Sequence, residues 1–204
     1  HSQFQGQKKE EILDLEENES LFSLVEKWLE RIPFLSTEGF DFTKKYEDAV
    51  NEMLEKEIKG INAAKLTDED KALRIRMIDE NRKYFERVLS DKEHNKAIAS
   101  GETKLSYKAT MSALLINLYR DEPILHLPYQ FLRSLVELDH KIATWRFRHV
   151  QMVEKMLGLK IGTGGSSGQG YLKQTVDKHK LFTDLANIST LMISRSYLPD
   201  LPKN

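Results

Sequence analysis

Apolar residues recur every three or four positions along most of the chain, with polar residues between them, which is the pattern of amphipathic helices. Ser20, Asp41, Thr67 and Ser106 each stand immediately before such a stretch and carry a side chain that can cap a helix. We therefore predict a helix after each of them. The helix after Ser106, over residues 107–119, is apolar on too many sides for a surface element and is predicted to lie centrally.

Between and beyond these helices the pattern is less regular. Residues 90–103 form a polar break, and Pro123 and Pro128 are predicted to bracket a short extended connection. Periodicity returns over residues 129–157, a long helix, and over residues 174–193, the last one. Because no stretch alternates with the period of a strand, we predict an all-α fold.

Composition favours a globular protein and excludes several other classes. The 204 residues suit one large domain or two small ones, and 40% hydrophobic with 31% charged residues is typical of a globular protein. The net charge of −1 predicts no nucleic-acid partner, and no apolar run is long enough to cross a membrane. The absence of cysteine excludes disulfides and thiolate chemistry. With no secretory signal, a cytoplasmic protein is expected, and the start at His1 suggests a fragment.

One histidine falls in the apolar stripe of the predicted helix over residues 129–157. The stripe follows three- and four-residue steps through Leu135, Leu138, Ile142, Trp145, His149, Met152 and Met156. We predict that His149 is buried there, whereas His140 falls on the polar side. A neutral imidazole against an apolar wall suits an axial ligand of haem iron. A core histidine hydrogen-bonded to a carbonyl is the commoner alternative for a lone histidine.

A glycine-rich loop follows this helix. Residues 158–170 hold six of the ten glycines of the chain, five of them in the run IGTGGSSGQG. The run lacks the Lys-Ser/Thr ending of a phosphate-binding loop, and no strand is predicted before it. Its free backbone N–H groups and its hydroxyls suit closure over a small polar ligand. A flexible linker has the same composition and stays open as the alternative.

The run WRFRHVQMVEKMLGLKIGTGGSSGQGYL, residues 145–172, resembles the C-terminal signature of the tryptophan 2,3-dioxygenase family. Further similar stretches are LVEKWLERIP, GFDFTKKYE, LSYKATMSALLINLYRDEP and LPYQFLRSLVELDHKIATW, while residues 59–101 match more weakly. The resemblance implies the C-terminal portion of an all-α helical bundle. We expect a charged helical segment over residues 1–105 and a haem-binding core over residues 106–204, with a substrate loop at 158–170.

The resemblance also assigns roles to single residues. It places the proximal ligand of haem b at His149, and it implies that the haem pocket includes Trp145, Met152, Val153 and Tyr171. It implies that the amino-acid group of bound L-tryptophan meets Thr163, Gly162 and Gly164. Gln169 stands where the family often has an aromatic residue, so the contact of that ring is not expected here.

The implied reaction is the oxidation of L-tryptophan by dioxygen to N-formylkynurenine, the first step of the kynurenine route, in a cytoplasmic homotetramer. The family's distal histidine and its carboxylate-binding arginine lie in an N-terminal half that these residues do not match. We therefore expect no catalytic residue in this chain, a need for that half as a partner, and little activity without it. The alternative is a non-catalytic helical module that binds haem or serves assembly.

Two other features have alternative interpretations. Trp28, Arg31 and Pro33 could form a shallow pocket for an aromatic amino acid. The preferred interpretation is that Trp28 is a buried anchor and Arg31 is solvated. The charge-rich residues 67–87 are predicted to be solvated helix faces rather than a source of acid–base catalysis.

Overall fold

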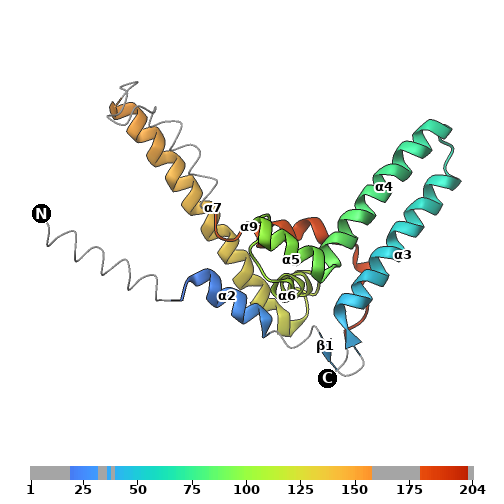
Figure 1. The fold of residues 1–204 in the computed structure, drawn as a ribbon, viewed down its shortest axis with the longest axis horizontal. Helices are drawn as coiled ribbons and strands as arrows, with labels where there is room; N and C mark the ends of the chain where they lie inside the picture. Colours follow the sequence, from blue (N-terminus) through green and yellow to red (C-terminus); the bar gives the residue numbers. More distant parts are fainter. Residues whose placement is uncertain (1–18, 32–35, 38–39, 158–179, 202–204) are drawn as a thin grey trace, which may run out of the picture.

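Figure 1 shows the computed structural model, which describes residues 19–31, 36–37, 40–157 and 180–201. The regular secondary structure of the described chain is helical apart from one pair of two-residue strands, which confirms the all-α prediction. The elements are α2 (Leu21–Glu30), β1 (Ser36–Thr37), β2 (Phe40–Asp41), α3 (Phe42–Ala63), α4 (Asp68–Leu89), α5 (Asp91–Ser100), α6 (Tyr107–Leu118), α7 (Pro123–Leu157), α9 (Thr183–Asn187) and the 3-10 helices η1 (Ile188–Leu191) and η2 (Arg195–Tyr197).

Helix α6 is the centre of the fold, as its sequence predicts. Residues 109–116 and 118 are all buried, and α2, α5, α7, α9 and η1 pack around the helix. The hydroxyl of Ser106 donates to Glu30 at 2.6 Å, which links the start of α6 to the end of α2. One buried cluster runs from Val25 in α2 to Ile193 after η1. The division of the chain at residue 105 stays a prediction.

Two pieces project from this centre in different directions (Figure 1). Helices α3 and α4 pack against each other as an antiparallel hairpin, and α7 extends on the other side. Leu73 and Met77 on the outer half of α4 are exposed, because that half lies away from α6. Most charged residues of α4 are exposed as well, which confirms the prediction of solvated faces. Among the described residues, no helix is long and apolar enough to span a bilayer.

The four predicted helix starts are confirmed. At each one, the capping side chain accepts a hydrogen bond from a backbone N–H near the helix start, which satisfies a donor that has no partner within the helix. The donors are Ser23 for Ser20, Lys44 for Asp41, Asp70 for Thr67 and Ala109 for Ser106.

The predicted polar break over residues 90–103 is wrong, because it contains helix α5. Ser90 accepts a hydrogen bond from the N–H of Glu93, and Asp91 and Glu93 place negative charge at the positive end of the helix. Gly101 ends the helix with φ of 76°, a left-handed conformation that favours glycine. These end signals are present in the sequence even though apolar residues are few.

The predicted extended connection between Pro123 and Pro128 is also wrong, since both belong to α7. Pro123 is the first residue of the helix, where its missing N–H costs no hydrogen bond and its fixed φ is already helical. Pro128 follows in the second turn, so only the start of the long helix lacks a backbone donor.

The last helix differs from the prediction over residues 174–193. In the described part, the chain is not helical at 180–182, and α9 begins at Thr183 and passes into η1 after Asn187. The N–H groups of Leu181 and Phe182 donate to the carboxylate of Asp139 on α7, at 3.0 and 2.8 Å. The short strands β1 and β2, which pair antiparallel, were not predicted either.

Candidate functional site

Helix α7 has two neighbouring apolar stripes, and only one of them is buried. The buried positions are Leu132, Leu135, Asp139, Ala143 and Val150. The other stripe, the α7 outer stripe, consists of Leu138, Ile142, Trp145, His149, Met152 and Met156. It is largely exposed, with 64% of the Trp145 surface and 69% of the Met156 surface accessible.

The prediction that His149 is buried is therefore wrong for the chain as described. The buried positions lie one residue further along the helix, at Asp139, Ala143 and Val150 rather than at Leu138, Ile142 and His149. The rotation of α7 is tied to Asp139, whose carboxylate lies inward to accept the two backbone N–H groups of residues 181 and 182. His140 is exposed on the polar side, as predicted.

Trp145 and His149 come together on the outer stripe, one helical turn apart. Their ring centroids are 5.6 Å apart and their planes are inclined by only 16°, so the indole stacks on the imidazole. The stacking covers one side of the imidazole ring with an apolar surface and limits the rotation of its side chain. Met152, which is half exposed, lies one turn beyond His149 on the same stripe.

The chemistry of the α7 outer stripe suits a haem-binding surface. A stripe of large apolar side chains is normally covered by a partner or a ligand rather than left to water. An imidazole available within such a stripe is the combination that haem needs, because the iron takes the nitrogen and the macrocycle takes the apolar surroundings. A single histidine is enough for this role. Among the described residues there is no group of three or more His, Cys, Asp or Glu side chains that could hold a metal ion.

The other predicted site residues lie outside what the structure describes. They are the side chain of Val153, the loop residues Gly162, Thr163, Gly164 and Gln169, and Tyr171 after the loop. The described residues on either side of the loop do show where it is attached. The chain leaves α7 at Leu157, and at Leu181 it is hydrogen-bonded to Asp139 of the same helix. His149 lies between these two attachment points in the sequence of α7.

The sequence prediction missed Asp139. This residue is only 7% exposed, and its two oxygens hold the chain where it returns to α7 after the loop. The sequence does indicate that Asp139 is buried, because it follows Leu132 and Leu135 at helical spacing on an apolar face. A carboxylate at such a position requires hydrogen-bond donors from elsewhere in the fold.

The structure of Trp28 has features of both interpretations, the buried anchor and the wall of a pocket. It is half-buried and packs edge-on against Phe131 of α7, with ring centroids 5.2 Å apart, as an anchor between helices would. It also lines a hollow of about 550 Å³ between α2 and the start of α7, whose lining residues are all apolar. Arg31 is exposed, as predicted, and does not line the hollow.

Comparison with known proteins identifies the family. Residues 1–192 match the family model of tryptophan 2,3-dioxygenase. The chain is 45% identical to the tryptophan 2,3-dioxygenase of Bdellovibrio bacteriovorus, over 95% of this chain and 54% of the relative. It is 45% identical to that of Dictyostelium discoideum, over 100% of this chain and 51% of the relative, and 40% identical to that of Mus musculus, over 97% and 49%. The chain thus spans about half the length of these relatives, and it belongs to the tryptophan 2,3-dioxygenase family.

Proposed function

We propose that this chain supplies the proximal haem ligand and the substrate loop of a haem-dependent dioxygenase that oxidises L-tryptophan to N-formylkynurenine. The observation that carries the proposal is the stacked pair Trp145–His149 on the α7 outer stripe. The names of the relatives support the reaction and the substrates, L-tryptophan and dioxygen.

His149 would bind the iron of haem b, and Trp145 would hold the imidazole in a fixed orientation by stacking on it. The exposed side chain of Met152 would lie against the macrocycle, together with Val153 and Tyr171. When bound, haem supplies the iron centre for the reaction with dioxygen. The outer stripe would supply apolar surroundings that exclude water from His149 when haem is bound there.

Thr163, with Gly162 and Gly164 beside it, would contact the amino-acid group of L-tryptophan. Hydroxyl and backbone N–H groups donate hydrogen bonds to a carboxylate without needing a charged side chain. Asp139 supports this role indirectly, because it fixes where the chain returns to α7 after the loop. The distal groups would come from sequence equivalent to the half of the relatives that this chain does not match, within a cytoplasmic homotetramer.

The absorption spectrum of the protein with added haem tests the axial ligand. We expect a Soret band typical of histidine ligation, and we expect His149→Ala to remove it. His140→Ala is the matched control, since it removes an exposed imidazole from the polar side of the same helix. Equal spectra for the two variants would show that His149 is not the ligand.

Titration with L-tryptophan tests the loop. Thr163→Ala should weaken binding of tryptophan by about tenfold, the contribution of one hydrogen bond, and leave the Soret band unchanged. Thr144→Ala is the control, because the Thr144 hydroxyl donates within α7 to the carbonyl of His140. Loss of the haem band in the Thr163 variant would place that residue against the haem instead.

A further inference from the structure

A second cavity, of about 200 Å³, lies away from α7. It is bounded by α4, α5, α6 and the α9–η1 segment, and residues from each of these elements line it. None of its lining residues belongs to α7. Pockets for drug-sized ligands usually measure about 300–1,000 Å³, so this cavity suits a molecule of only a few non-hydrogen atoms.

The cavity contains a buried hydroxyl without a partner. Thr110 lines it from the first turn of α6 and is only 7% exposed, and its Oγ1 has no hydrogen bond among the described residues. A buried hydroxyl without a partner is unfavourable, because it has lost its bonds to water and gained nothing in return. The other such hydroxyl, that of Ser112, does not belong to the cavity lining. Thr110 thus points to an occupant that can form a hydrogen bond.

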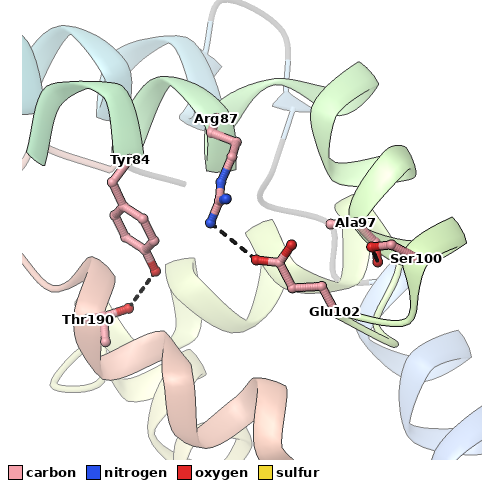
Figure 2. Close-up of polar contacts among 6 residues, drawn as sticks. All are labelled: Tyr84, Arg87, Ala97, Ser100, Glu102 and Thr190. Carbon is pink, nitrogen blue, oxygen red and sulfur yellow. Dashed lines mark hydrogen bonds and ion pairs between the residues drawn. The ribbon is translucent and has the colours of Figure 1, made fainter. Parts of the chain in front are cut away.

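The cavity lining includes one arginine, Arg87, and three carboxylates, those of Glu93, Glu102 and Asp184. Glu93 pairs with Lys96, and Asp184 accepts hydrogen bonds from residues 103–105, whereas Arg87 and Glu102 pair with each other (Figure 2). Arg87 on α4 and Glu102 after α5 form an ion pair of 3.2 Å in which both side chains are more than half exposed. An exposed pair of this kind contributes little to stability, so a ligand that offers both charges can replace it at low cost. Arg87 would take a carboxylate and Glu102 an ammonium group.

The lining also includes apolar residues. Val88, Ile188 and Leu191 are apolar, and the last two are almost fully buried. A ligand can therefore place its charged groups at Arg87 and Glu102 and a short side chain along these residues. A hydroxyl at the end of that side chain would meet Thr110.

We propose that this cavity binds a small zwitterionic α-amino acid with a hydroxyl side chain, and L-serine is the probe that fits this description. The proposal is independent of the haem site, since the two sites share no residue. It gives the chain a second ligand site, at which a molecule smaller than tryptophan binds and stabilises the packing of α5 and η1 against α4.

Calorimetric titration with L-serine and L-alanine tests the proposal, because the two differ only by the hydroxyl. We expect L-serine to bind about tenfold more tightly, the contribution of one hydrogen bond. Thr110→Val, which keeps the shape of the side chain, should abolish that difference. Arg87→Gln should weaken both ligands by about tenfold. Arg82→Gln is the matched control, since Arg82 lies on the same helix but pairs with Glu55 and does not line the cavity.

Three results would overturn the proposal: no binding of either amino acid, equal affinities for the two, or an Arg87 variant that binds like the Arg82 variant. A crystal structure grown with L-serine that shows only ordered water at Thr110 would also overturn it. Arg87 is exposed, so its variant remains informative even if Thr110→Val folds poorly. The Soret band of each variant separates these outcomes from a failure of the haem site.

Discussion

The substitution Asp139→Asn tests how the C-terminal segment is held against α7. In the native chain, one carboxylate oxygen accepts the N–H of Leu181 and the other accepts that of Phe182. Asparagine has nearly the same shape but only one acceptor oxygen. Its NH₂ group would face the second N–H, donor against donor, in a buried position.

The expected effect is large for a change of one atom. A hydrogen bond to a charged group contributes roughly 1.5–3 kcal/mol, against about 1 kcal/mol for a neutral one. Asparagine weakens one of the two bonds and leaves the other N–H without an acceptor. We therefore expect the free energy of unfolding to fall by about 3 kcal/mol. The weaker hydrogen bonds would also affect the core, because Phe182 is buried and stacks with Phe22 of α2.

Urea unfolding followed by circular dichroism measures this effect, and amide hydrogen exchange at Leu181 and Phe182 shows whether the segment detaches locally before the chain unfolds. Glu137→Gln is the matched control, since it makes the same chemical change on the same helix. Glu137 is exposed and pairs with Lys141, so its variant should unfold at the native urea concentration. If the two variants unfold alike and exchange alike, Asp139 does not anchor the segment.

Two further predictions concern backbone conformation and pH. Gly101→Ala should destabilise the protein by about 1 kcal/mol, because its φ of 76° is left-handed, whereas Gly60→Ala inside α3 should stabilise it by roughly 0.5–1 kcal/mol. Thermal unfolding of both variants should show shifts of opposite sign. Burial raises the pKa of Tyr119 to about 12, so the folded chain keeps a proton that the unfolded chain loses near pH 10. The free energy of unfolding should therefore fall between pH 10 and 12, and less steeply in Tyr119→Phe when measured in urea.

Local signals in the sequence account for the parts of the fold that were predicted correctly. The four N-caps depend on contacts within three residues along the chain, so residue type and position are enough to identify them. The central place of α6 follows from its composition, since a helix that is apolar on every side has to be surrounded. Apolar periodicity alone does not predict helix α5, whose signals in the sequence are the residues at its two ends, Ser90 and Gly101.

Contacts between distant segments account for most of what was not predicted. The start of the last helix depends on Asp139, more than forty positions away from residues 181 and 182. The cavity around Thr110 depends on four elements that converge only in the folded chain. Neither leaves a periodic pattern in the sequence, because periodicity reports the face of one helix and not its neighbours.

The error about His149 has a more specific cause, and it bears on the function. Helical spacing correctly placed Trp145 and His149 side by side on an apolar stripe, but α7 carries two such stripes next to each other. Which of them is buried is decided by the partners of Asp139, since a buried carboxylate has to lie where donors are available. With Asp139 turned inward, His149 is turned outward, where an imidazole is free to bind a cofactor. The residue that anchors the chain after the loop therefore also sets the direction of the proposed haem ligand.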